Sequence, residues 1–222
     1  MDAEPGCPRA YPDNVFAGRS SSAVAMKPAD VFLRITCALD ESGIAYMLTG
    51  SFAGAFYGAL RTTQDIDFVI EANDEQLRKF VHLLPAGEYY VDLDAALEAR
   101  KRESLFNVID MVTGWKIDFI IRKSRAFSEE EFLRRERVTI LLDGNVDLFV
   151  ATAEDLVISK LEWAKRAQSQ RQIEDAASVL RVGYAFLDRP YLRKWILALG
   201  LTEGWEAAAV AAELPSDWRA WE

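Results

Sequence analysis

Regularly spaced apolar residues divide most of the chain into predicted helices and strands. In residues 31–43 they recur every three or four positions up to a glycine, which predicts a helix. Residues 44–50 form a short apolar run typical of a strand, and the alanine-rich residues 52–60 favour a second helix. β-Branched and aromatic residues predict another strand at 65–72, which precedes an amphipathic helix at 74–84.

Two later segments have the pattern of β-hairpins. Residues 105–121 contain two β-rich runs separated by Thr113-Gly114. Residues 137–151 repeat this pattern around Asp143-Gly144, a dipeptide that favours tight turns between strands. The sequence therefore predicts several strands, and the second strand of the first hairpin carries Asp118.

The C-terminal third has apolar residues at helical spacing. It predicts three helices, at residues 153–168, 171–182 and 189–199, with glycines such as Gly204 lying between helices. We therefore predict three regions: a flexible leader over residues 1–26, a core of strands and helices over 27–151, and a helical region over 152–222.

Composition narrows the class of protein. The 222 residues, of which 50% are hydrophobic, suit one compact domain with a smaller appendage. No stretch approaches the ~20 apolar residues of a membrane-spanning helix, so no membrane partner is expected. Two cysteines, Cys7 and Cys37, do not indicate a disulfide framework, and the N-terminus lacks the apolar region of a signal peptide. These features favour a cytoplasmic location.

The charge argues against general binding to a nucleic-acid backbone, which needs a broadly positive surface. The formal net charge is −9 and the pI is near 4.8. Local basic patches remain open, although short charged runs are usually solvated helix faces. The three basic clusters are Arg100-Lys101-Arg102, Arg134-Arg135 with Arg137, and Lys165-Arg166.

Candidate chemistry lies where the predicted strands begin and end. Gly50 leaves room for a backbone to approach a phosphate, and Ser51 and the amides that follow supply donors. Asp65 and Asp67 are two residues apart on a strand, so their carboxylates emerge on one face about 6 to 7 Å apart. Alone they could form an exposed acidic strand face. Together with Asp118 they favour a metal site.

Such carboxylates suit Mg²⁺ or Mn²⁺, because hard cations take oxygen ligands and share them with substrate phosphates. With Asp118 as a third carboxylate, two ions could clamp an in-line phosphoryl displacement. Asp118 could also take the proton from an attacking hydroxyl group. The donor would be a nucleoside triphosphate, and pyrophosphate would leave.

The run GSFAGAFYGALRTTQDIDFVI resembles the nucleotidyltransferase signature, in which Gly-Gly or Gly-Ser precedes Asp-x-Asp or Asp-x-Glu among apolar residues. Within that superfamily the chain resembles the minimal and AbiEii-like branch, over about residues 30–182. The resemblance implies an α+β, polymerase-beta-like fold, with a mixed sheet flanked by helices and a C-terminal helical appendage. It also implies that Gly50 and Ser51 bind triphosphate, that Asp65 and Asp67 bind metal, and that Asp118 completes the triad.

The later segment EDLVISKLEWAKRAQSQRQIEDAASVL resembles the helical region of the family, where a lysine faces the triphosphate. Lys160 matches that lysine, although a surface lysine with its stem on apolar neighbours is the alternative. Arg171 and Asp175 match the following basic and acidic positions more loosely. They stand four apart on a predicted helix, so an ordinary ion pair explains them equally, and we favour it for Asp175.

The leading hypothesis is an enzyme that moves a nucleoside monophosphate from a nucleoside triphosphate to an acceptor hydroxyl. The acceptor could be a small molecule, a protein side chain or an RNA end. The resemblance also implies the toxin of a toxin–antitoxin system, with an antitoxin protein as partner. The competing hypothesis is a non-catalytic relative that binds nucleotide or a partner protein.

Overall fold

The computed structural model describes residues 28–59, 63, 65–141 and 145–215. The predicted leader, residues 1–26, lies outside the described residues, and so does the predicted Asp143-Gly144 turn.

A seven-stranded mixed sheet forms the centre of the molecule, with strand order β3-β4-β5-β2-β1-β7-β6. The strands are β1 (Ala45–Thr49), β2 (Asp65–Glu71), β3 (Tyr89–Val91), β4 (Leu105–Asp110), β5 (Lys116–Ile121), β6 (Glu136–Leu141) and β7 (Asn145–Val150). Both predicted hairpins are confirmed as antiparallel pairs, β4 with β5 and β6 with β7. Strands β2 and β5 run parallel, which places the strand of Asp118 beside that of Asp67.

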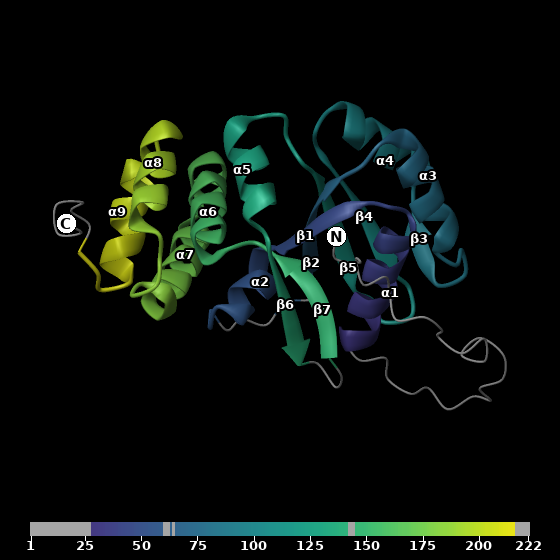
Figure 1. Cartoon of the computed structure of the whole chain (residues 1–222), viewed down its shortest axis with the longest axis horizontal. Helices are drawn as coiled ribbons and strands as arrows, with labels where there is room; N and C mark the ends of the chain where they lie inside the picture. The colour runs from purple at the N-terminus through teal and green to yellow at the C-terminus, as the bar shows by residue number, and fades with distance from the viewer. Residues whose placement is uncertain (1–27, 60–62, 64, 142–144, 216–222) are drawn as a thin grey trace, which may run out of the picture.

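Helices surround this sheet and continue beyond it. They are α1 (Pro28–Glu41), α2 (Gly50–Phe56), α3 (Asp74–Leu83), α4 (Leu93–Lys101), α5 (Ala126–Arg134), α6 (Ala153–Ala167), α7 (Gln170–Gly183), α8 (Arg189–Ala198) and α9 (Thr202–Ala211). Figure 1 shows α6 to α9 grouped at the end of the molecule opposite α3 and α4. The structure is thus an α+β fold with a helical appendage after the last strand.

The two faces of the sheet have different partners because successive side chains on a strand point to opposite faces. On one face, Phe68 of β2 meets Phe32 of α1 with ring centroids 6.3 Å apart. Phe80 of α3 packs on the same large core. On the other face, Val69 joins a small cluster with Phe132 of α5. Asp67 shares the face of Val69, so it points away from the large core.

Three helices were not predicted from the sequence, namely α4, α5 and α9, and neither was the short strand β3. Gly204 was expected between helices, but it lies inside α9. A Cβ at Gly204 would meet Leu161 at 3.5 Å and Ile173 at 3.6 Å. The glycine therefore allows α9 to pack closely on α6 and α7, where a boundary residue was predicted.

Two remaining sequence predictions concern the cysteines and membrane-spanning helices. Cys37 is disulfide-bonded in the structure, which goes against the expectation that the two cysteines do not indicate a disulfide framework. Within the described ranges, no helix is both long enough and apolar enough to cross a membrane.

Candidate active site

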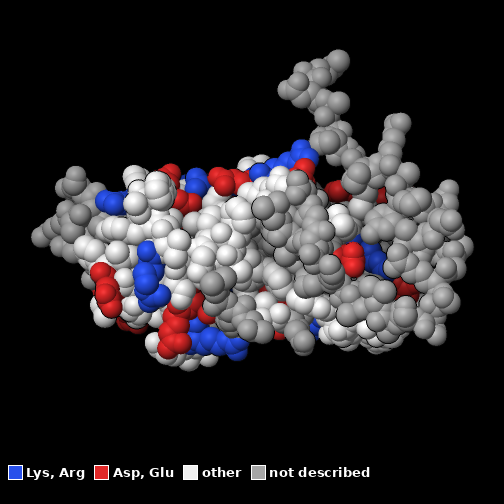
Figure 2. Space-filling view, turned by 90° about the horizontal axis from the view of Figure 1, so that it is seen from below, with Lys and Arg blue, Asp and Glu red and all other residues white. Residues whose placement is uncertain are grey.

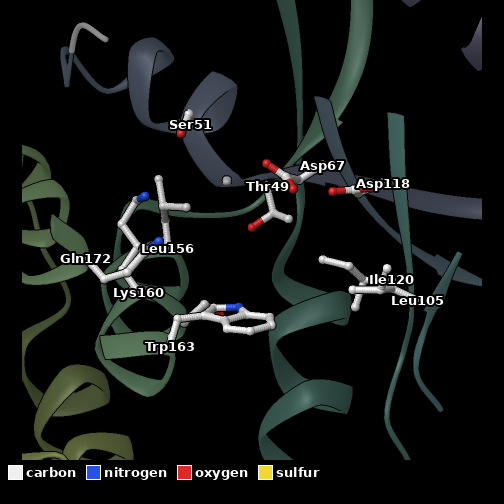
Figure 3. A pocket seen from close by; sticks show the side chains of 12 residues that line it. Thr49, Ser51, Asp67, Leu105, Asp118, Ile120, Leu156, Lys160, Trp163 and Gln172 are labelled. Atoms are coloured by element: carbon white, nitrogen blue, oxygen red, sulfur yellow. The ribbon is translucent and has the colours of Figure 1, made fainter. Parts of the chain in front are cut away.

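Two aspartates meet at the centre of the sheet. Asp67 of β2 is directly opposite Asp118 of parallel β5, and it is also opposite Thr49 of β1. Residues opposite each other on paired strands direct their side chains to the same face. Both carboxylates therefore point into one cavity of about 210 Å³ (Figure 3).

Gly50 brings backbone against this carboxylate pair. Its φ is +67°, a left-handed conformation that favours glycine, and it begins α2 directly after β1. A Cβ at this position would lie 1.9 Å from Asp67 Oδ2, so there is no room for a side chain. Ser51 follows in the first turn of α2 and lines the same cavity (Figure 3).

The charges in the cavity are unevenly compensated. The pKa of Asp67 is raised to about 6, chiefly by burial and also by the neighbouring Asp118 and Asp65 carboxylates, against the opposing effect of Lys160 and Lys116. Asp118 Oδ2 accepts a hydrogen bond from Lys116 Nζ at 2.8 Å. Asp118 Oδ1 is buried and has no hydrogen-bond partner among the described residues. The cavity thus holds an oxygen that is available to a ligand.

Helix α6 forms the opposite wall of the cavity. Lys160 is buried in this wall, and its Nζ donates to Asp175 Oδ2 of α7 at 2.9 Å. This pair corrects the sequence interpretation, in which Asp175 was assigned to an ion pair with Arg171. Two close helices, α6 and α7, bring Lys160 to Asp175, and such a contact between helices cannot be deduced from i,i+4 spacing.

Two of the predicted site residues are not among the residues that line the cavity. Asp65, the first residue of β2, is exposed, and it acts on the cavity through its charge, which raises the pKa of both Asp67 and Lys116. Arg171 is exposed on α7, and its neighbour Gln172 lines the cavity instead. The predicted metal triad is therefore represented here by Asp67 and Asp118, with Asp65 nearby.

Some residues of the site were missed in the sequence, among them Thr49 and Trp163, which line the cavity, and Lys116, which contacts Asp118. Lys116 precedes Asp118 by two residues on a strand, so alternation places it on the face of the carboxylates. Trp163 follows Lys160 by three residues on a helix, which puts both on one helix face. These spacings were visible in the sequence. Thr49 was not, because its place depends on the pairing of β1 with β2.

The donor set fits a divalent cation shared with a substrate. Within the described part of the chain, no three His, Cys, Asp or Glu side chains form a group that could hold a metal ion by themselves. Mg²⁺, however, is usually bound through one or two carboxylates together with substrate phosphates and water. Asp67, with its raised pKa, and Asp118, with its partnerless buried oxygen, are the two side chains suited to that role.

Comparison with solved structures identifies the fold. The solution structure of the antibiotic-resistance factor ANT(2'')-Ia has a TM-score of 0.50 at 15% sequence identity, over 79% of this chain and 93% of that chain. A crystal structure of ANT(2'')-Ia in complex with adenylyl-2''-tobramycin has a TM-score of 0.49 at 13% identity, over 77% and 95% of the two chains. An antigenic nucleotidyltransferase-like protein from Paracoccidioides brasiliensis has a TM-score of 0.49 at 14% identity, over 88% and 97%.

The sequence itself matches no protein-family model and no curated protein. The likeness to solved structures therefore concerns architecture, since a fold alone does not define an activity. The chain has the α+β fold of the nucleotidyltransferases, as its sequence predicted.

Proposed function

We propose that this chain is a metal-dependent nucleotidyltransferase that moves a nucleoside monophosphate from a nucleoside triphosphate to a hydroxyl group of an acceptor. The observation that carries this proposal is the pair Asp67 and Asp118 beside the backbone of Gly50 in one cavity. Two close carboxylates repel each other unless a cation compensates them. A cation bound there and a glycine that permits close approach of backbone together suit the recognition of phosphate.

The side chains of the cavity divide the work in this proposal. Gly50 and Ser51 would bind phosphate through backbone amides and the hydroxyl group, and Lys160 would face it from the opposite wall. Asp118 would accept the proton of the acceptor hydroxyl as its oxygen attacks the α-phosphorus. The bond from that phosphorus to the β-phosphate oxygen would break, and pyrophosphate would leave. A divalent ion, held by Asp67 and Asp118, would neutralise charge on the phosphates.

The test is transfer of label from each α-labelled nucleoside triphosphate to a panel of small-molecule, protein and RNA acceptors. Wild-type protein is compared with Asp67→Asn and Asp118→Asn, which keep the side-chain shape and remove the charge. Asp147→Asn is the control, because Asp147 is an exposed strand residue outside the cavity lining. We expect label transfer by wild type and control, with at least a 100-fold loss in the two cavity variants. Activity of Asp67→Asn equal to the control would refute the proposal.

A second candidate function is binding of nucleotide or a partner protein without transfer. Lys116 favours this reading, since its ammonium group already compensates Asp118 at 2.8 Å, as a cation would. The two functions differ in label transfer. A nucleotidyltransferase should be stabilised against heat by triphosphate together with Mg²⁺ and should transfer label, whereas a module that binds nucleotide should be stabilised without transfer and a module that binds protein alone should show neither effect.

A cellular role as an AbiEii-like toxin belongs to the same proposal and rests on the resemblance in residues 30–182. A toxin should arrest growth when the chain is produced alone, and the Asp67→Asn variant should not. Growth arrest that is equal in both would separate any toxicity from nucleotidyl transfer. Release from arrest by a co-produced neighbouring protein would identify the antitoxin partner.

A further inference from the structure

A second cavity, of about 80 Å³, lies next to the carboxylate cavity. The two cavities share four lining residues, Thr49, Ile120, Ser159 and Trp163. Gly50, Ser51 and Lys160, the residues proposed to bind the donor triphosphate, line only the first cavity. A molecule that extends from the carboxylates toward the C-terminal end of β5 would therefore enter the second cavity.

The lining of this second cavity is rich in positive charge. The charged residues are Arg122, Lys123, Arg125 and Arg166 against Glu131 and Glu162. The pKa of Glu131 is raised to about 8, chiefly by burial and also by the carboxylate of Asp155, so this carboxyl group adds little negative charge at neutral pH. Among the lining residues, four cations therefore face one ionised carboxylate, and we call this space the basic cavity. Arg122 is paired outside the lining, with Glu71 at 2.7 Å and Glu129 at 3.7 Å, so the excess of positive charge lies at Lys123, Arg125 and Arg166.

The cations of the basic cavity are only partly compensated. Arg125 and Arg166 share the single carboxylate of Glu162, at 2.7 Å and 3.6 Å respectively. No carboxylate of the described residues lies within ion-pair distance of Lys123 Nζ. Burial lowers the pKa of Lys123, and the neighbouring Arg166 and Arg125 lower it further. An anion placed among these groups would relieve that repulsion.

Helix α5 adds to this positive field. It begins at Ala126, beside the basic cavity, with Arg125 at its N-cap. The side chain of this N-cap residue makes no capping hydrogen bond to the first turn. The N-terminus of a helix carries partial positive charge, which favours anions.

The arginines of the cluster Arg100-Lys101-Arg102, in contrast, are paired with carboxylates. Arg100 pairs with Asp74, and Arg102 pairs with Glu98. Figure 2 shows one face of the molecule, on which Lys and Arg side chains lie beside Asp and Glu side chains and form no single basic patch. The cluster that contains Arg166 differs because it contributes to a cavity next to the proposed reaction site.

We propose that the basic cavity holds a phosphate group of the acceptor, so that the hydroxyl compound modified here carries a phosphate or phosphodiester. This inference rests on the proposed function and names the chemical class of its acceptor. The cavity is suited to hydrogen-bond an anion through Lys123 and Arg166 while the acceptor hydroxyl reaches Asp118. A polycationic acceptor would meet repulsion in the same place.

The test measures binding by calorimetry in the presence of Mg²⁺ and a saturating non-hydrolysable ATP analogue, which fills the donor site. The probes are inorganic phosphate and a single-stranded RNA trinucleotide. The variants are the single change Lys123→Gln and the double change Lys123→Gln/Arg166→Gln. The double change Lys101→Gln/Arg102→Gln removes the same two charges from exposed positions on and next to α4 and serves as the matched control.

We expect saturable binding of at least one probe to wild type. Tighter binding of inorganic phosphate would indicate a small phosphorylated acceptor, and tighter binding of the RNA trinucleotide would indicate a nucleic-acid end. The double change in the basic cavity should weaken this binding at least about tenfold, and the single change by less, because charged hydrogen bonds are lost. The control should bind as wild type does. All three variants should bind the ATP analogue with wild-type affinity.

The results that overturn the inference differ from those that overturn the proposed function. If the ATP analogue binds wild type but neither probe does, or if the double change leaves probe binding intact, the inference is wrong and nucleotidyl transfer survives. If the ATP analogue fails to bind wild type, the proposed function is wrong and the inference goes with it. Loss of ATP-analogue binding in the cavity variants would assign the basic cavity to the donor and overturn the inference.

Discussion

Replacing Gly50 with alanine would insert a methyl group into the carboxylate pair. The new Cβ would lie 1.9 Å from Asp67 Oδ2 and 2.6 Å from Asp67 Cγ. Ordinary van der Waals contact begins at 3.4 Å, so the carboxylate would have to retreat by about 1.5 Å. The pairing of β2 with β1 and β5 fixes the Asp67 backbone, so the side chain must change its rotamer.

The change has two effects of different size. Alanine at a φ of +67° costs about 1 to 2 kcal/mol of folding free energy, because its Cβ crowds the carbonyl oxygen in the left-handed region. Displacement of a reacting group by about 1 Å can cost about 100-fold in rate, or about 2.7 kcal/mol of transition-state stabilisation. The Gly50→Ala variant should therefore lose far more activity than its loss of stability explains.

A matched control separates the two effects. Gly43, at the other end of β1, has a φ of +69°, and a Cβ there would meet Gln76 Nε2 at an ordinary 3.5 Å. Gly43→Ala should show the left-handed penalty in urea unfolding and keep its label transfer. Gly50→Ala should show at least the same loss of stability, and kcat/KM for the triphosphate should fall at least about 100-fold.

Equal label transfer by the Gly50→Ala and Gly43→Ala variants would refute this reasoning, since it would mean that Asp67 can retreat without consequence. Retained affinity for triphosphate with a reduced kcat would instead support it. That pattern places the damage in the reacting geometry rather than in binding.

Three further predictions concern stability and ligand contact. Lys160→Met removes one partner of the part-buried pair with Asp175 and should cost about 3 kcal/mol in urea unfolding, most of which Lys160→Met/Asp175→Leu should recover; additive losses would contradict this. The raised pKa of Glu131 means that wild-type stability is lost as pH rises from about 4.5 to about 8. Glu131→Gln can still accept a hydrogen bond from Ser159 and should lack that loss of stability. The free energy of unfolding of the variant should therefore rise relative to wild type by a few kcal/mol between pH 5 and 9. Parallel unfolding profiles would disprove it. Trp163→Phe should abolish the change in tryptophan fluorescence that triphosphate and Mg²⁺ cause in wild type, with little change in affinity by calorimetry.

Local pattern predicted the part of the site that is continuous in sequence. The order of strand, Gly50, short helix and strand follows from periodicity and glycine placement, and each side chain in it depends on near neighbours. The pairing of Asp67 with Asp118 could not be deduced in this way. It requires β5 to lie parallel to β2, and that arrangement follows from contacts of the whole sheet.

One of the missed helices, α5, has polar residues where a predicted helix should be apolar. Helix α5 buries Ser128 and Glu131 together with Phe127 and Phe132, so its apolar stripe is interrupted. Both buried polar residues have partners, since Glu131 accepts from Ser159 of α6 at 2.8 Å and Ser128 accepts from Arg125 Nε at 3.0 Å. Compensation of this kind between elements is invisible to a count of apolar residues along one segment.

Net charge, likewise, does not show where in the chain a charged binding site lies. A formal charge of −9 argues against a broad positive surface, because that property is a sum over the chain. A binding site depends on how charges are paired locally. Arg134, for example, contacts both Glu154 and Asp155, whereas Lys123 has no carboxylate of the described residues within ion-pair distance. A chain with a net negative charge can therefore contain a cavity that attracts anions, provided that its carboxylates form ion pairs with cations elsewhere.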